Sequence, residues 1–190
     1  MKYFVLLMLS WLLAVPGAAR AEATPLDPQG TALIQDAAML GAFEIQASQM
    51  ALQNAGQENV KEFARYMLLE HELISARLAS LASAKKVDLS TDLDTEQRNE
   101  LDRLQARKGA DFDKRYIEQV AVGAHEQALE RFKAASESSG DAELKAFAAE
   151  TMKRLQDHLD KAKALARQAA TDSGSAKADP ESGAPASRSR

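Results

Sequence analysis

Apolar residues recur at spacings of three and four along nearly the whole central part of this chain, and this periodicity constrains the fold more than any other feature. Such spacing places the apolar side chains on one face of an α-helix. The alternation of period two that marks strands is absent, and β-branched residues are sparse. We therefore expect one all-α domain over residues 31–170, which is long enough to bury a substantial core.

Turn and capping signals divide this region into four long helices and one short one. The long helices are expected at residues 27–54, 58–85, 111–137 and 141–168. The turns that follow the first and third are short, so each joins two antiparallel helices. The short helix lies in the longer crossover, where Asp94 and Gln97 have the spacing of a capping box. The pattern predicts an antiparallel four-helix bundle with a short extra helix in the crossover.

The first long helix carries very few charges. Between Thr31 and Asn54 its only charged residues are Asp36 and Glu44. A helix of this kind either lies at the centre of the core or packs against a second subunit or a helical partner. The sequence leaves both interpretations open, so a homo-oligomer formed through this helix is one expectation.

The N-terminal residues 1–21 have the pattern of a secretory signal peptide. Lys2 precedes an apolar run that is too short to span a membrane comfortably, and a small-residue cleavage site of the Ala-x-Ala type ends at Ala21. Cleavage would start the mature chain at Glu22 and leave residues 22–30 as a linker. An uncleaved N-terminal membrane anchor is the competing interpretation.

The C-terminal residues 171–190 are rich in Ser, Ala, Gly and Pro, and this composition predicts a disordered tail. A tether to the cell envelope is the alternative. No other segment is apolar enough to cross a bilayer once the signal is removed. The expected location is therefore the periplasm or the exterior, in association with the envelope.

Composition excludes several functions. The chain has no cysteine, so disulfides, thiolate metal ligands and a thiol-linked lipid anchor are all ruled out. Its formal net charge of -4 gives no indication of nucleic-acid binding. Glycine-rich phosphate loops and nucleophile motifs are missing, so the sequence predicts no catalytic residue and favours a non-enzymatic role.

The three histidines each occupy an inward-facing position on an apolar stripe. His71 lies where the pattern of its helix calls for Leu, and His125 and His158 occupy similar positions on the third and fourth long helices. Counting from the turns at about 1.5 Å per residue places all three and Glu44 within about 5 Å of one another along the bundle axis. We expect these four side chains to lie at mid-height of the bundle.

Three imidazoles and one carboxylate would suit a divalent first-row metal ion. Zn, Cu, Ni and Fe would all be accepted, because imidazole discriminates poorly among them. Glu70 and Glu126 each lie beside a histidine in the sequence and are candidates to accept a hydrogen bond from a ligating ring. Alternatively, a buried His–Glu network can simply specify helix register. The favoured function is a non-catalytic structural or interaction protein of the envelope, and the alternative is a metal-binding protein that uses these four side chains.

Four segments carry a resemblance to a known family: AFEIQASQMAL, EFARYMLLEH, FDKRYIEQVAVGAHEQAL and AELKAFAAETMKRLQDHLDKA. They resemble the exported, ferritin-like bacterial family called domain of unknown function 4142, often labelled "predicted outer membrane protein". The similarity covers about residues 30–167 and includes all three histidine contexts. It implies a ferritin-like four-helix fold and no established activity. The outer-membrane label finds no support in the patterning of this sequence.

Two more specific metal chemistries are disfavoured. Ferritin-like di-iron proteins carry Glu-x-x-His motifs on two helices, whereas the residues three before the histidines here are Leu68, Val122 and Leu155. A ferritin-type di-iron oxidase is therefore not expected. A copper site built from methionines is suggested by Met39, Met50, Met67 and Met152. Methionines at helical spacing usually fill cores, so we interpret them as packing residues.

Overall fold

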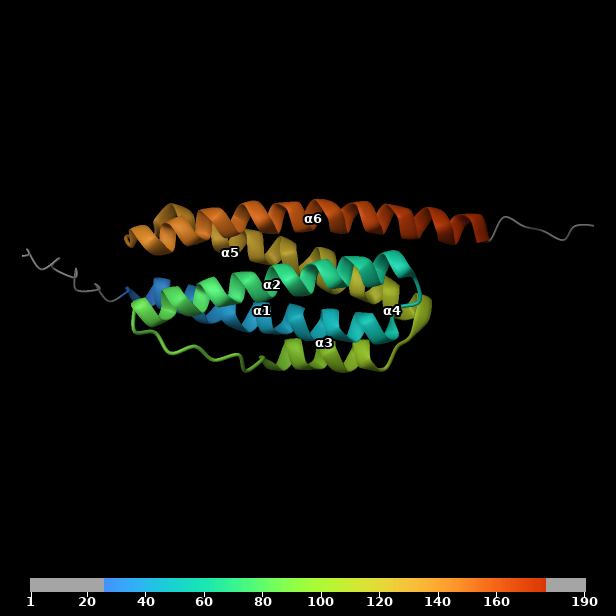
Figure 1. Cartoon of the computed structure of the whole chain (residues 1–190), viewed down its shortest axis with the longest axis horizontal. Helices are drawn as coiled ribbons and strands as arrows, with labels where there is room; N and C mark the ends of the chain where they lie inside the picture. The colour runs from blue at the N-terminus through green and yellow to red at the C-terminus, as the bar shows by residue number, and fades with distance from the viewer. Residues whose placement is uncertain (1–25, 177–190) are drawn as a thin grey trace, which may run out of the picture.

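The computed structural model describes residues 26–176, and this part of the chain forms a bundle of helices (Figure 1). The elements in order are α1 (Pro28–Asn54), α2 (Glu58–Ala84), α3 (Thr95–Gln105), α4 (Gly109–Arg115), the π-helical segment η1 (Tyr116–Ala124), α5 (His125–Ser138) and α6 (Ala142–Ala176). The predicted all-α bundle is confirmed. The predicted signal peptide and most of the predicted tail lie outside the described residues.

Three helices, α1, α3 and α6, begin where a side chain accepts a hydrogen bond from a free backbone N–H group. At α1, Pro28 occupies the first turn and Asp27 Oδ1 accepts a hydrogen bond from the Gly30 N–H at 2.6 Å. At α3, Asp94 and Gln97 form the capping box that their spacing predicted. At α6, Asp141 Oδ1 accepts from the Leu144 N–H at 2.8 Å.

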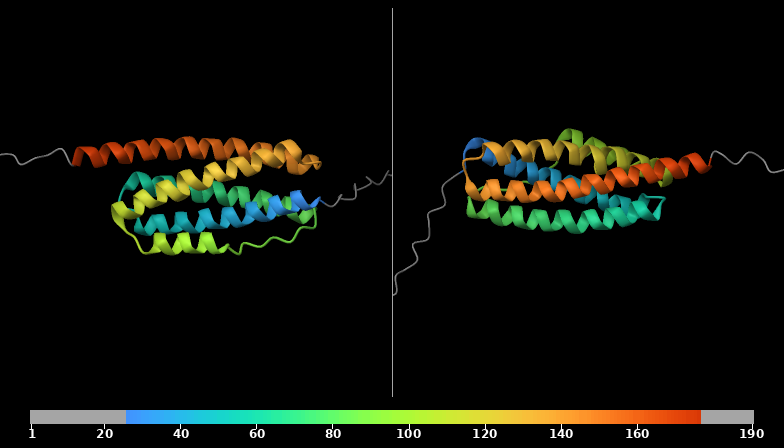
Figure 2. Two further views of the ribbon diagram at one scale, coloured as in Figure 1. Left: turned by 180° about the vertical axis from the view of Figure 1, so that it is seen from behind. Right: turned by 90° about the horizontal axis from the view of Figure 1, so that it is seen from above.

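Two antiparallel hairpins, α1–α2 and α5–α6, pack against each other, and α3 lies along the outer side of α1 (Figures 1 and 2). Helix α1 packs against α2, α3, η1 and α5. Its low charge is therefore explained by a central position. A subunit interface through α1 stays a prediction. Within the described part of the chain, no helix has both the length and the apolar character needed to cross a membrane.

The third long helix differs from the prediction in its middle. A single α-helix was expected over residues 111–137, but a nine-residue π-helical segment, η1, separates α4 from α5. π-Helical turns widen the helix and rotate the residues that follow, and they are frequent at functional sites. Apolar spacing cannot reveal one, because one extra residue in a turn leaves the pattern on either side intact. His125 is the first residue after this segment.

Helix α6 is longer than expected. It continues to Ala176, although the sequence predicted that the tail would begin at residue 171. The added residues contain no proline, and the Thr171 hydroxyl donates to the Gln168 carbonyl at 2.7 Å, so nothing in their chemistry forces the helix to stop earlier. The C-terminal part of α6 extends past the rest of the bundle (Figure 2).

The apolar core consists of two clusters with a polar layer between them. Each histidine falls between a residue of one cluster and a residue of the other on the same stretch of helix: Met67 and Ile74 flank His71, Ala124 and Ala128 flank His125, and Leu155 and Ala162 flank His158. Glu44 lies between Ala38 of one cluster and Ala47 of the other. All four polar side chains are thus held at one level of the bundle.

The turn between α1 and α2 is fixed by a side chain from α4. The Asp113 carboxylate is buried and accepts hydrogen bonds from the Gly56 and Gln57 N–H groups, both at 2.9 Å. Gly56 also approaches Gly109 so closely that an added Cβ would lie 2.8 Å from the Gly109 Cα. Only glycine fits at this crossing, so the two chain segments lie in direct backbone contact.

Replacing Asp113 by Ala should lower the free energy of unfolding by about 2–3 kcal/mol, because two N–H groups at the start of α2 lose a charged acceptor. Urea unfolding at neutral pH measures the effect. The control is Asp111→Ala, which removes an exposed carboxylate from the same helix and should change stability by less than about 0.5 kcal/mol. Equal losses in the two variants would contradict the capping role.

Candidate metal centre

The three histidine rings meet in the polar layer, each delivered by a different helix: α2, α5 and α6. All three pairs of ring centroids lie 5.3–5.4 Å apart. The residues are 3%, 1% and 0% exposed for His71, His125 and His158, respectively. The common height expected from the sequence therefore corresponds to actual side-chain contact.

One nitrogen of each ring points to a common centre. His71 Nε2 lies 3.4 Å from His125 Nε2, which in turn lies 3.2 Å from His158 Nδ1. These three nitrogens all lie within 4.8 Å of one another. Each contact between two ring nitrogens can use at most one proton, so several lone pairs face the same small space.

The fourth group is the carboxylate of Glu44 from α1, which is 2% exposed. Its Oε2 lies 2.8 Å from His71 Nε2, and its Oε1 lies 3.4 Å from His125 Nδ1. Neither contact has the direction of a hydrogen bond, and both oxygens lack a hydrogen-bond partner among the described residues. Buried carboxylates are normally hydrogen-bonded, ion-paired or bound to a metal, so this arrangement requires an explanation.

The π-helical segment sets the orientation of His125. The Val120 carbonyl oxygen, five residues earlier, lies 3.4 Å from His125 Nδ1, on the same side as Glu44 Oε1. With two acceptors facing it, Nδ1 is the ring nitrogen that carries the proton. Nε2 is then left with its lone pair directed at the other two imidazoles, as a metal ligand would be.

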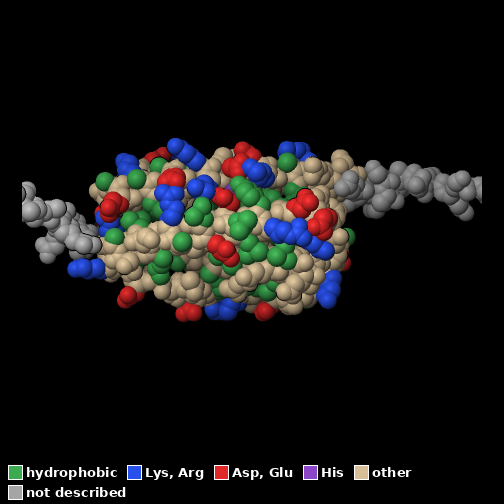
Figure 3. Space-filling view, in the orientation of Figure 1, with side chains coloured by type: hydrophobic (Ala, Val, Ile, Leu, Met, Phe, Trp, Pro, Cys, Tyr) green, Lys and Arg blue, Asp and Glu red, His purple; other side chains and the backbone are tan. Residues whose placement is uncertain are grey.

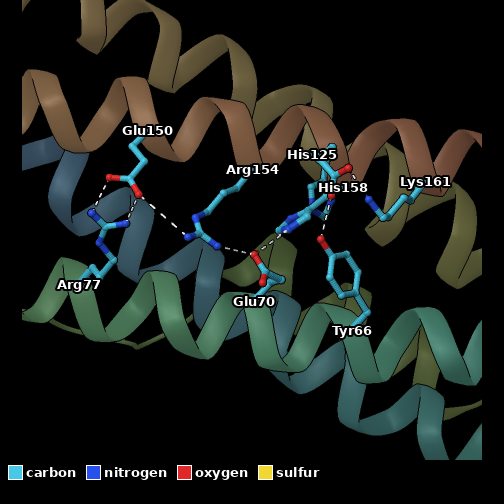
Figure 4. Close-up of polar contacts among 9 residues, drawn as sticks. Tyr66, Glu70, Arg77, His125, Glu150, Arg154, His158 and Lys161 are labelled. Atoms are coloured by element: carbon cyan, nitrogen blue, oxygen red, sulfur yellow. Dashed lines mark hydrogen bonds and ion pairs between the residues drawn. The ribbon is translucent and has the colours of Figure 1, made fainter.

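His158 is oriented the opposite way, with Nδ1 facing inward. Its outward Nε2 is buried, has no hydrogen-bond partner within residues 26–176 and lies 3.6 Å from Glu70 Oε2 (Figure 4). The Tyr66 ring packs edge-on against the His158 ring, with centroids 5.6 Å apart. Glu70 was expected near a histidine because it adjoins His71 in the sequence. It faces His158 on another helix instead.

Glu126, the other carboxylate expected to support a histidine, lies away from the site. It is exposed and pairs with Lys163 at 2.9 Å. Neighbouring residues on a helix point about 100° apart, so the residue next to an inward-facing histidine is turned toward the surface. Sequence adjacency was therefore the wrong criterion.

Burial and the neighbouring imidazoles lower the pKa values of His125 and His158 and so favour their neutral forms. Burial, together with the nearby His71 and His125, lowers the pKa of His158 to about 4. Burial also lowers the pKa of His125. Burial alone would raise the pKa of Glu44, but His125 and His71 outweigh it and bring that pKa down to about 2. At neutral pH the Glu44 carboxylate is therefore ionised, and its negative charge favours a cation in the cluster.

The donor spacing matches a coordination sphere. Metal–nitrogen and metal–oxygen bonds of about 2.0–2.1 Å give donor–donor edges of about 3.4 Å in a tetrahedron and about 2.9 Å in an octahedron. The two nitrogen–nitrogen distances, 3.4 and 3.2 Å, are close to the tetrahedral edge, and the nitrogen–oxygen distance of 2.8 Å is close to the octahedral edge. His71, His125, His158 and Glu44 therefore lie near enough to one another to share a single ion.

A second buried polar pair lies one helical turn from Glu44, and no sequence pattern predicted it. The Ser48 and Tyr116 hydroxyls are 2.9 Å apart in the apolar interior. Burial raises the pKa of Tyr116 well above its usual value. The Tyr116 ring belongs to η1, so the π-helical segment supports the polar layer at two points.

Fold and site together define an all-α bundle with a buried histidine–carboxylate cluster. The chain belongs to the family described as a domain of unknown function (DUF4142), whose model matches residues 15–165. The ferritin-like part of the resemblance stays a prediction. No curated protein matches the sequence. Among solved structures, a DUF305 fragment from Deinococcus radiodurans has a similar fold, with a TM-score of 0.67 and 12% identity over 76% of this chain and 99% of that chain.

The free energy of unfolding of the metal-free protein should rise with pH between about 4 and 6.5. In this window the unfolded chain binds a proton on His158 and the folded chain does not, so the stability is fully present above pH 6.5 and is lost as the pH falls toward 4. The gap between the two pKa values corresponds to about 3 kcal/mol.

Urea unfolding in chelator at pH 7, 6, 5 and 4 tests this dependence. The comparison is His158→Gln, which cannot titrate and should show a shallower dependence over the same window. Identical slopes for the two proteins would show that His158 is not held neutral by its surroundings.

Proposed function

We propose that this protein binds one divalent first-row transition metal ion in the polar layer of its bundle. The ligands are His71 Nε2, His125 Nε2, His158 Nδ1 and Glu44 Oε2. The observation that carries the proposal is the Glu44 carboxylate, which is buried, ionised and without a hydrogen bond among the described residues, and which faces three convergent imidazoles. A dication supplies the missing partner for that charge.

The alternative, a purely structural His–Glu network, accounts less well for these contacts. Networks that specify a unique core satisfy their buried donors and acceptors. Here the two Glu44 oxygens and His158 Nε2 all lack a hydrogen bond within the described part of the chain. The same atoms become satisfied or nearly so when an ion occupies the centre and Glu70 accepts from His158 Nε2.

The donor set limits the metal and the kind of site. Three imidazoles and a carboxylate suit Zn, Cu, Ni or Fe, and the chain has no thiolate to favour softer ions. Four protein donors, each with a side chain no more than 4% exposed, make a closed site of the type that holds an ion. We infer a metal-holding role without a catalytic step.

The proposed location is outside the cytoplasm. Support comes from the N-terminal residues 1–21, with their basic start, apolar run and Ala-x-Ala site. In an envelope compartment a thiol-free histidine site has a chemical advantage, because cysteine ligands are readily oxidised there. Self-association through α1 remains an additional expectation.

Purified protein should bind one equivalent of Co²⁺ or Zn²⁺, and Co²⁺ should give the visible absorption of a low-coordinate nitrogen–oxygen site. At a free ion concentration of 100 times Kd, binding should raise the free energy of unfolding by about 3 kcal/mol. Elemental analysis after dialysis, together with thermal unfolding with and without the ion, measures both effects.

Three variants make the test specific. The double variant His71→Ala, His125→Ala should lose the bound ion, and Glu44→Gln should lower affinity at least about tenfold, because it removes the charge and keeps the shape. Glu126→Gln is the matched control, since it neutralises an exposed carboxylate beside His125 and should bind as wild type does. Wild-type protein that takes up no more Zn, Cu, Ni, Fe or Co than the double variant would refute the metal site.

A further inference from the structure

A surface pocket lies between α2 and α6, directly outside His158. It has a cavity volume of about 390 Å³ and is lined by Tyr66, Glu70, Glu150, Lys153, Arg154 and Asp157. Two of these residues also touch the buried ring: Tyr66 packs on it edge-on, and Glu70 Oε2 approaches its Nε2 to 3.6 Å. These two side chains therefore lie between the pocket and His158.

His158 Nε2 faces this pocket without a partner. The residue is fully buried, and its outward nitrogen has no hydrogen bond among the described residues. This nitrogen lies 3.6 Å from Glu70 Oε2, a group that lines the pocket, while Nδ1 of the same ring faces His125 Nε2 in the cluster. One ring thus connects the pocket with the ion site.

The Arg154 guanidinium occupies a place between two carboxylates of the pocket. It donates to Glu70 Oε2 at 2.8 Å and lies 4.0 Å from Glu150 Oε1 (Figure 4). Glu150 is in turn paired with Arg77, so a row of alternating charges runs along the α2–α6 boundary toward His158. Acidic and basic side chains lie side by side on this face of the molecule (Figure 3).

We infer that the α2–α6 pocket is the route by which a divalent cation reaches His158, and that Arg154 is the gate that closes it. The inference rests on the proposed metal site. A dication entering the pocket competes with Arg154 for the Glu70 carboxylate, because both are cations that need the same oxygens. Once the cation has passed, the Arg154 guanidinium pairs with Glu70 again, holds Glu70 beside His158 Nε2 and closes the route.

The contacts favour movement at this point. The Arg154 and Glu70 side chains are 32% and 21% exposed, and ion pairs with this much solvent contact contribute little to stability. The ligands themselves are far more buried. Side-chain rotation of Arg154 therefore requires much less rearrangement than separation of two packed helices.

Stopped-flow mixing with Co²⁺ and release into excess EDTA measure uptake and loss. Arg154→Ala and Arg154→Gln should speed both rates at least about fivefold and leave Kd within about threefold, because removal of a gate lowers the barrier in both directions. Circular dichroism verifies that each variant is folded. The matched control is Lys153→Ala, which removes the same charge from the same pocket and should leave both rates within about twofold of wild type.

Each contrary outcome has a distinct meaning. Unchanged rates in both Arg154 variants would overturn the gate. Faster release with unchanged uptake would show that Arg154 only positions Glu70, and would also overturn the gate. Equal acceleration of both rates by Lys153→Ala would show a general effect of charge, with the same consequence for the gate. Wild-type protein that binds no Co²⁺ at equilibrium would refute the metal site itself, which dialysis establishes before any rate is measured.

Discussion

The charge of Glu44 is the constraint on which the rest of the structure depends. An ionised carboxylate deep in a core costs several kcal/mol unless it is paired and hydrogen-bonded. This one faces His71 and His125 across distances of 2.8 and 3.4 Å without a hydrogen bond to either. Neighbouring groups orient the imidazoles around Glu44. The π-helical segment orients His125, and Glu70 lies beside the outward nitrogen of His158.

The polar layer also determines how the bundle is held together. It divides the apolar residues into two clusters, so each end of the bundle packs on its own core. The four proposed ligands come from α1, α2, α5 and α6, which are the four long arms of the two hairpins. An ion at their centre would join both hairpins by direct bonds, and its binding free energy would then contribute to folding. The polar layer interrupts the apolar core, and a bound metal ion would offset the resulting loss of stability.

The sequence predicted the height of the four side chains and the inward position of the histidines, but not the orientation of each ring. Helical rise alone placed His71, His125, His158 and Glu44 at one level, because turns at known positions fix where each residue falls along the axis. The π-helical segment could not be foreseen, since it rotates His125 without disturbing the apolar spacing. Glu126 and Glu70 show the same limit: both adjoin a histidine in the sequence, yet one lies on the surface and the other faces a ring from a different helix.

Similarity of fold carries no function here, because bundles with the same arrangement of helices serve unrelated roles. The proposed metal site must also allow the ion to exchange. All four proposed ligands belong to packed helices. Exchange would therefore depend on the side chains that cover the cluster, and the partly exposed pair of Arg154 and Glu70 lies beside His158, where the α2–α6 pocket approaches the proposed site. Movement of this ion pair would allow an ion to enter a site whose ligands stay in place.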